Sequence, residues 1–248
     1  MFKFFSMLLG LVPFLALQVL AGFPNDPKPC QYGDRACLMS TIEYLMHNKS
    51  QGFASLNLVK TEPLRVAKMV MKQGAESPVN IDLTFINNDI TGYSRIKMKD
   101  VKGFGKDLGT KHDLYAVAPV LSMIGDYTIK GRVLVLPITG TGKSNITMVN
   151  VRIHIRFTGV PMEKPDGLYM KVKDVRLDVQ PDKMIFNFDN LFNGDKMLGE
   201  TMNGFLNENW KDIYHEVRDS FNEAFAQIFT TVIDTVFSKY PYERYFTE

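Results

Sequence analysis

The chain is poor in the residues that most often build catalytic and metal sites. Its 248 residues include only two cysteines and four histidines, and the cysteines do not form a C-x-x-C pair. His215 and Glu216 begin a zinc-protease pattern, but Asp219 stands where that motif needs its second histidine. The formal net charge of +2 is too small to attract nucleic acid or anionic lipid. We therefore expect no catalytic residues, no metal, no cofactor and no nucleic-acid partner.

Long apolar runs are confined to the first 22 residues. Lys3 precedes an almost unbroken apolar stretch, and Val19 and Ala21 have the spacing of a cleavage site, so residues 1–22 are predicted to be a secretory signal peptide. The alternative is a membrane anchor, but Pro13 interrupts a run that barely reaches the ~20 residues of a membrane span. We expect a secreted, extracellular protein with no stable membrane anchor, in which residues 23–248 form one domain.

The two cysteines follow directly after this segment. In an oxidising compartment Cys30 and Cys37, seven residues apart, are predicted to form a short-loop disulfide. A metal or redox pair is the alternative, although no histidine lies near them. Asn48 and Asn145 begin sequons and are candidate N-glycosylation sites.

Apolar periodicity divides the remaining chain into helical and extended parts. Residues 34–47 are predicted to form a short helix with Asp34 as its N-cap. Residues 64–189 contain alternating stretches such as 79–85 and 149–157, typical of a mainly antiparallel sheet, with a bulge predicted near Lys173 and Asp174. Residues 195–238 contain no proline and carry a wide apolar stripe, predicting one long helix capped by Asn193 or Asp195. The pattern favours an α+β fold in which a strongly curved sheet wraps this helix.

Two stretches imitate ligand-binding loops. Residues 136–147, LPITGTGKSNIT, resemble a phosphate-binding loop, but Pro137 replaces its first glycine and a strand pattern follows Ser144 where the motif needs a helix. We interpret the glycines as part of a hairpin loop in which Lys143 and Ser144 face solvent. Residues 189–200 imitate a calcium loop, but Leu191 offers no side-chain oxygen at the third position. A turn that enters the long helix is the better interpretation.

The block NLFNGDKMLGETMNGFLNENW at residues 190–210 carries a resemblance to a known family. Together with the closing SKYPYERYF, with PVNIDLTFINNDITG at residues 78–92 and with the cysteine pair, it is similar to the insect takeout and haemolymph juvenile-hormone-binding family. Hormone-binding members have a second disulfide, for which this chain has no cysteines, so the takeout-like branch is the closer match. Many relatives have a proline in the long helix where this chain has Asp219, which implies a straighter helix.

The resemblance implies the tubular lipid-binding architecture, with an elongated apolar tunnel between the curved antiparallel sheet and the long C-terminal helix. It implies no enzymatic activity and a circadian or feeding-related role in haemolymph or sensory fluid. The Cys30–Cys37 bridge would tether an N-terminal helix that helps to close one end of the tunnel. The expected partner is a hydrophobic small molecule such as a terpenoid, a fatty acid or an ester, bound by a monomer.

Apolar side chains on the concave sheet face and on the helix stripe are candidates to line that tunnel, and plain core packing is the alternative for each. The candidates are Leu45, Val133, Val135, Val151, Ile153, Ile155, Phe157, Phe205, Ile213, Val217 and Phe221.

Two other functions stay open at this point. A secreted interaction or signalling protein could have the same fold without cargo, and a tunnel filled by side chains would favour it. A hydrolase acting on an ester would need a serine–histidine pair, which no motif indicates.

Overall fold

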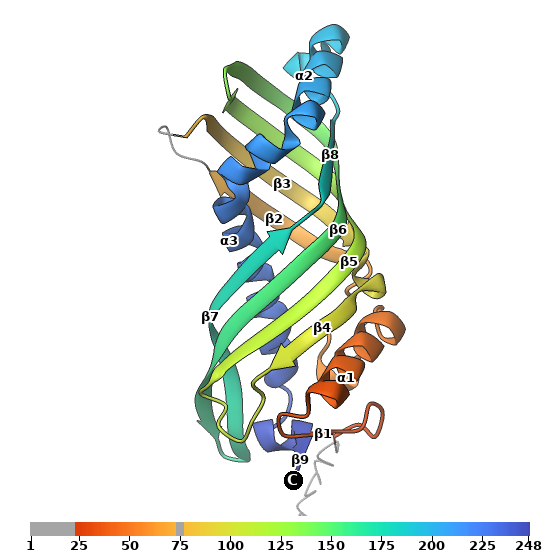
Figure 1. Cartoon of the computed structure of the whole chain (residues 1–248), viewed down its shortest axis with the longest axis vertical. Helices are drawn as coiled ribbons and strands as arrows, with labels where there is room; N and C mark the ends of the chain where they lie inside the picture. Colours follow the sequence, from red (N-terminus) through yellow and green to blue (C-terminus); the bar gives the residue numbers. More distant parts are fainter. Residues whose placement is uncertain (1–22, 73–76) are drawn as a thin grey trace, which may run out of the picture.

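The protein is an elongated molecule in which one curled sheet holds a long helix (Figure 1). The computed structural model describes residues 23–72 and 77–248, and the predicted signal peptide lies outside these ranges. None of the helices in the described ranges is long and apolar enough to cross a membrane. The elements, with 3-10 helices labelled η, are β1 (Cys30–Gln31), α1 (Arg35–Asn48), η1 (Ala54–Leu56), β2 (Leu64–Lys72), β3 (Val79–Thr91), η2 (Tyr93–Arg95), β4 (Lys97–Lys102), β5 (Lys111–Val133), β6 (Leu136–Lys164), β7 (Gly167–Gln180), β8 (Lys183–Phe188), η3 (Phe192–Gly194), α2 (Lys196–Glu208), α3 (Trp210–Phe237), η4 (Tyr242–Tyr245) and β9 (Phe246–Thr247).

The main sheet is built on two very long strands. β5 and β6 pair with each other from Lys111–Thr158 to Val133–Leu136, so this hairpin extends through most of the molecule. β3 and β4 share one edge of β5, while β7 and β8 share the outer edge of β6, and β2 pairs with β3. Every pairing in this sheet is antiparallel. The α+β fold and the curved antiparallel sheet predicted from the sequence are confirmed.

Bulges let these strands curve. Arg156 pairs with Arg176 and Thr158 pairs with Lys173, so β7 has one residue more than β6 in this interval. Asp174 has a φ of +54°, in the left-handed region, where a bulged residue breaks the regular pleat. The predicted bulge near Lys173 and Asp174 is confirmed.

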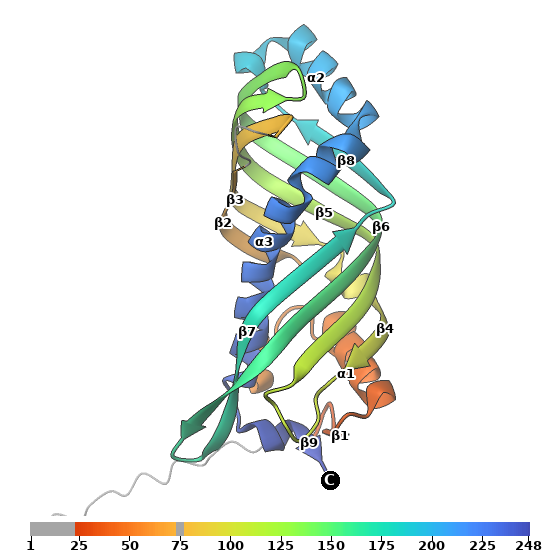
Figure 2. The same cartoon turned by 60° about the vertical axis from the view of Figure 1, so that its left-hand side comes forward.

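The prediction of one continuous C-terminal helix is wrong. The segment forms α2 and α3, which change direction at Asn209, whose φ and ψ are −104° and 21°. The Asn209 side-chain amide donates to the Phe205 carbonyl at 2.8 Å, and such local bonds favour asparagine at helix ends over helix interiors. Asp195 caps α2 by accepting from the Leu198 N–H. The helix α3 continues through Asp219 and runs along the concave side of the sheet beside β7 (Figure 2).

The hairpin predicted around Gly140 and Gly142 is also misplaced. The β5–β6 turn is Leu134–Val135, and both glycines lie inside β6. A Cβ at Gly142 would lie 2.6 Å from the Asp189 carbonyl oxygen, so these glycines allow the chain after β8 to cross close to the strand. Lys143 is exposed and pairs with Asp126 at 2.6 Å, but Ser144 is buried rather than facing solvent.

Side-chain amides join the free edge of β8 to α2. The Asn207 Oδ1 accepts from the Phe186 N–H, and its Nδ2 donates to the Phe186 carbonyl, both at 2.8 Å. Asn203 makes the same two-way contact with Phe188 at 2.9 Å. Each asparagine therefore replaces a neighbouring strand for one residue of the edge, which satisfies backbone groups that would otherwise be unpaired.

The helix α3 fastens the edge of β7 in the same way. The Val179 N–H donates to Asn222 Oδ1 at 3.2 Å, and the Val172 N–H donates to Asp234 Oδ1 at 2.5 Å. The opposite edge of the sheet, β2, instead borders a groove along α3 with open sections of about 640 and 790 Å³. On this side Ser220 Oγ donates to the Lys72 carbonyl at 3.3 Å, so most of the bonds between the sheet edges and the helices lie on the β7–β8 side.

We predict that Asn207→Ala lowers the free energy of unfolding by about 1–3 kcal/mol, because it leaves both backbone groups of Phe186 without partners. Asn187→Ala is the matched control, since Asn187 is an exposed asparagine on the same strand, and it should change stability by less than about 0.5 kcal/mol. Urea denaturation measures both. Equal losses in the two variants would contradict the role given to Asn207.

Candidate functional site

Two apolar cavities lie between the concave face of the sheet and α3. The α1 cavity, about 210 Å³, is enclosed by α1, the C-terminal end of α3 and the chain termini of the described part. The α2 cavity, about 60 Å³, lies between the sheet and the first half of α3. Neither cavity extends along the whole of α3, so the interior is divided rather than forming the single tunnel that the resemblance implies.

The volumes decide which cavity is the better candidate for a ligand. An engineered apolar cavity of about 150 Å³ is large enough to bind benzene. The α1 cavity exceeds that volume and the α2 cavity is less than half of it. The α1 cavity is also smaller than the ~300 Å³ at which sites for drug-sized ligands begin. It therefore suits a small or slender apolar molecule, while side chains nearly fill the α2 cavity.

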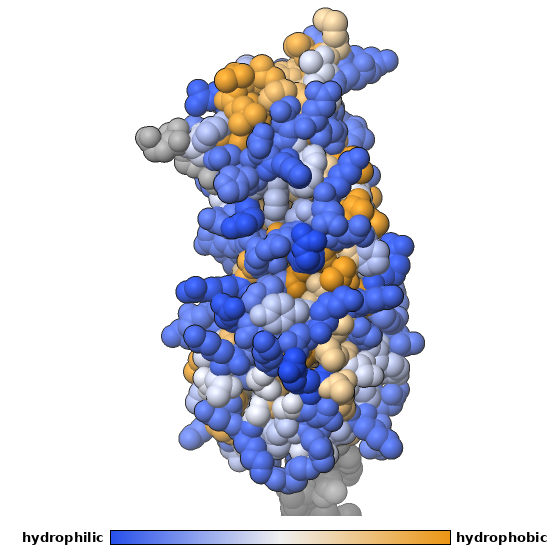
Figure 3. Space-filling view, viewed as in Figure 1, coloured by the Kyte–Doolittle hydropathy of each residue, from blue (hydrophilic) through white to orange (hydrophobic). Residues whose placement is uncertain are grey.

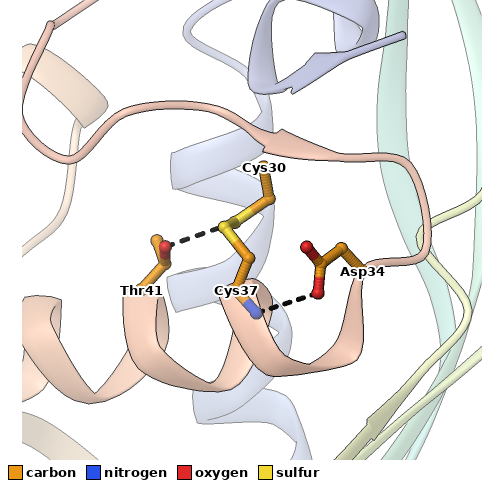
Figure 4. Close-up of a disulfide and its surroundings, with 4 residues drawn as sticks. All are labelled: Cys30, Asp34, Cys37 and Thr41. Carbon is orange, nitrogen blue, oxygen red and sulfur yellow. Dashed lines mark hydrogen bonds between the residues drawn. A yellow bond between two sulfur atoms is a disulfide. The ribbon is translucent and has the colours of Figure 1, made fainter.

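The helix α1 forms one wall of the α1 cavity and is held at both ends. Asp34 Oδ1 caps its first turn by accepting from the Cys37 N–H at 3.1 Å, and the Cys30–Cys37 disulfide ties that turn to β1 (Figure 4). At the other end, His47 Nε2 lies 2.7 Å from the Ile96 carbonyl oxygen. The predicted helix, its cap and the disulfide are therefore all present, and they place the apolar face of α1 over the cavity.

The C-terminal segment closes the same end of the molecule. β9 pairs in parallel with β1, placing Phe246 beside Cys30. Phe246 and Tyr245 line the cavity, and Phe104 and Phe237 stack with their ring centroids 6.2 Å apart. The wall of the α1 cavity is therefore made by the two ends of the described chain together with α1, α3 and the sheet residues Leu114 and Phe157.

Polar groups are scarce on both linings. Lys28 is the one charged side chain among the described residues that line the α1 cavity, and Thr41 supplies a hydroxyl. In the α2 cavity the Tyr214 hydroxyl is already used, because it donates to the Val179 carbonyl. An arrangement of this kind can hold an apolar chain and orient one polar end.

The structure places the sequence-predicted lining residues in four different environments. Leu45 and Phe157 line the α1 cavity, while Val133, Ile213, Val217 and Phe221 line the α2 cavity. Val151, Ile153 and Ile155 are buried in the core, and Phe205 packs against the core, but none of these four lines either cavity. The sheet face was therefore predicted correctly for the β6 residues, while the division into packed and hollow regions was not.

The prediction that Val135 lines the interior is wrong. Val135 is 83% exposed because it occupies the two-residue turn between β5 and β6.

Met197, in the first turn of α2, is 74% exposed. Hydrophilic side chains cover most of the surface in Figure 3, and a prominent apolar patch lies at the end that carries α2 and this hairpin.

The sequence interpretation missed most of the lining of the α2 cavity. Ile81, Leu83 and Phe85 alternate along β3 with polar residues, so the same period-2 pattern that indicated the strand could have nominated them. Asn203 and Asn207 were also missed, although asparagines four residues apart in a helix interior oppose helix propensity and so call for a tertiary partner. The other residues of the α2-cavity lining that the sequence interpretation missed are Met71, Met123, Ile129, Ile146, Met184, Phe186, Phe188, Leu206 and Tyr214.

A histidine–carboxylate pair lies on the outer face of the sheet. His154 Nε2 lies 2.7 Å from Asp113 Oδ1, which also accepts from Arg156 Nε at 3.0 Å. His154 alternates with the buried residues Ile153 and Ile155 on β6, so it points away from the concave face. This pair therefore cannot act on a molecule held in either cavity.

Comparisons with known proteins agree with this architecture. The family model described as "Haemolymph juvenile hormone binding protein (JHBP)" matches residues 8–247. The chain is 27% identical to "Circadian clock-controlled protein daywake" of Drosophila melanogaster over 249 aligned positions, covering 98% of this chain and 96% of that protein. It is 26% identical to the daywake protein of Drosophila yakuba, covering 96% and 94%. The crystal structure of Epiphyas postvittana Takeout 1 superposes with a TM-score of 0.73 at 24% identity, covering 86% of this chain and 96% of that one.

The His112 ring packs against Phe104 and Phe157, two residues that line the α1 cavity. His112 is fully buried, accepts from the Phe104 N–H at its Nδ1 (3.0 Å) and donates from Nε2 to the Leu108 carbonyl (3.1 Å). Burial lowers the pKa of His112 from its usual 6.5, against the opposing effects of Leu108 and of the carboxylates of Asp113 and Asp107. A second proton would have to enter at Nδ1, where the Phe104 N–H already donates.

We predict that the protein loses stability as the pH falls below about 6.5, the pKa of an unfolded histidine, because the unfolded state then binds the proton that folded His112 excludes. The contribution of His112 is fully present above that pH. The free energy of unfolding can fall by up to about 1.4 kcal/mol for each pH unit when one proton is taken up on unfolding. Urea denaturation at several pH values should show this slope diminished in His112→Gln and retained in the control His154→Gln. An equal slope in wild type and His112→Gln would contradict this account.

Proposed function

The chain belongs to the haemolymph juvenile hormone binding protein family, and we propose that it is a secreted carrier that holds a small hydrophobic ligand in the α1 cavity. The family is one of hydrophobic-ligand-binding proteins rather than of enzymes. The observation that supports this proposal most directly is the apolar α1 cavity itself, whose volume of about 210 Å³ exceeds that of a cavity able to bind benzene.

The driving force is burial of the ligand's apolar surface. Each Å² of apolar ligand surface removed from water contributes roughly 25 cal/mol. The lining offers Leu45, Phe157 and Val236 to the body of the ligand and Lys28 and Thr41 to a polar end. A terpenoid, a fatty acid or a fatty ester fits this chemistry.

Secretion is part of the proposal. A disulfide such as Cys30–Cys37 persists in oxidising extracellular compartments. Asn48 at the end of α1 and Asn145 on the outer face of β6 are both exposed, so both sequons are open to glycosylation. The fly relatives are named as circadian clock-controlled, and we extend a circadian role to this chain only as a hypothesis, which transcript levels across a light–dark cycle would test.

A second candidate function is an interaction protein of the same fold without cargo. The α2 cavity, with about 60 Å³ of free volume, favours this alternative because side chains occupy most of that part of the interior. The two functions differ in whether an apolar molecule of defined mass accompanies the purified protein, which native mass spectrometry of the secreted protein measures.

We predict that Val236→Trp weakens binding of a fluorescent fatty-acid probe by at least about tenfold, which is about 1.4 kcal/mol. Val236 lines the α1 cavity, and the free space there accommodates the indole ring without the strain of an overpacked core. Val135→Trp is the matched control, because the exposed hairpin side chain touches neither cavity, and it should leave probe affinity unchanged. Wild-type protein that binds no fatty probe would contradict the proposed function.

We predict that the double variant Cys30→Ser/Cys37→Ser releases the probe several-fold faster and lowers the free energy of unfolding by no more than about 3 kcal/mol. The bridge holds α1 over the cavity, but its loop is shorter than the 15-residue loop that contributes roughly 3 kcal/mol to folding. Stopped-flow dissociation and thermal unfolding measure the two effects separately. Identical dissociation rates in the variant and the wild type would show that α1 does not control release.

A further inference from the structure

The two cavities are separated along α3 by a short and well-defined interval. Phe221 is the last residue of α3 on the lining of the α2 cavity, and Val232 is the first on the lining of the α1 cavity. Eleven residues at 1.5 Å each place them about 16 Å apart along the helix axis. Whatever fills this interval decides whether the interior is one chamber or two.

Aromatic side chains fill the interval. Phe225 is 3% exposed and stacks on Phe221 with ring centroids 4.4 Å apart. Phe229, one turn further along, meets the buried ring of Tyr93 edge-on, with centroids 5.9 Å apart and planes at 89°. Tyr93 belongs to η2, directly after β3, so it approaches α3 from the sheet side. Phe225 and Phe229 line neither cavity, which places them between the two.

We propose that Tyr93, Phe225 and Phe229 form an aromatic barrier that sets the maximum length of ligand the α1 cavity accepts. This inference rests on the proposed carrier function and adds a selectivity to it. A linear chain that enters past α1 gains apolar contacts until its end reaches Val232, behind which Phe229 packs against Tyr93. Further carbons then have to displace packed rings or remain in water.

A charged side chain on the lining supplies the other limit. Lys28 is exposed and is the one charged side chain among the described residues of this lining. A fatty carboxylate is therefore oriented with its charge at Lys28 and its tail toward Phe229. The distance from Lys28 to the barrier then limits the length of the ligand, and the preferred ligand is a linear amphiphile of limited length.

A series of saturated fatty acids from eight to eighteen carbons tests the proposal, with each affinity measured by displacement of a fluorescent fatty probe. Each CH₂ that becomes buried should strengthen binding by about fourfold. In the wild type the affinity should rise with length and then level off at the length at which the tail meets the barrier. In Phe229→Ala the levelling should come at least two carbons later, so the longest acids bind at least roughly 15-fold tighter than to the wild type.

Further variants keep the test independent of folding. Phe205→Ala is the matched control, because this phenylalanine lies on α2 outside both cavities, and its levelling length should equal that of the wild type. Val232→Phe adds a ring on the α1-cavity side of the barrier and should move the levelling to shorter acids. If Phe229→Ala does not fold, this opposite shift still decides the question. Lys28→Ala should weaken binding of the acids and leave that of their methyl esters unchanged.

Each outcome has one meaning. The barrier is supported if the affinity stops rising at a longer acid in Phe229→Ala and at a shorter acid in Val232→Phe. A levelling length unchanged in both variants overturns it, even when the wild type binds fatty acids well. Equal effects of Lys28→Ala on acids and esters overturn the assigned orientation. Wild-type protein that binds no fatty acid of any length refutes the carrier function itself.

Discussion

The hydrogen bonds that join the free edges of β7 and β8 to the C-terminal helices hold this architecture closed. A curled sheet has two edges, and each edge presents backbone groups that need partners. Asn203 and Asn207 supply those partners to β8, while Asn222 and Asp234 supply them to β7. The helices therefore serve two purposes, since they bury the apolar concave face and also replace the missing next strand.

The bonds to α2 and α3 are concentrated on the β7–β8 side, although Ser220 Oγ also donates to the Lys72 carbonyl of β2 at 3.3 Å. The wall of the interior is thinner on the β2 side. On the β2 side, Met71 lines both the α2 cavity and the outer groove, and Val232 lines both the groove and the α1 cavity. The ends also differ, because a disulfide, a helix cap and the β1–β9 pair hold α1 in place. The interior is thus a divided apolar space whose roomier part lies under α1.

Local patterns predicted much of this fold. Asp34 and the apolar face of residues 34–47 were sufficient to predict α1, and the change in alternation parity near Lys173 predicted the bulge, because both depend on residues adjacent in the chain.

The break at Asn209 was missed because the apolar stripe continues through it. The hairpin was misplaced because Gly140 makes room for Leu191 and Gly142 for Asp189, partners about 50 residues away that no local pattern reveals. Cavities are harder still to predict from a sequence, because Ile153 and Val133 both alternate with polar residues in the same way. Only the packing of neighbouring elements decides which of the two borders empty space.

Where an apolar ligand sits in the folded protein is the most direct test of this account. A crystal structure of the protein bound to a ten- or twelve-carbon fatty acid would answer it. The account predicts electron density in the α1 cavity, with the carboxylate near Lys28 and the tail ending at Phe229, and rings of Phe225 and Phe229 in place. A ligand bound in the groove between β2 and α3, or an α1 cavity that stays empty at saturating ligand, would contradict it.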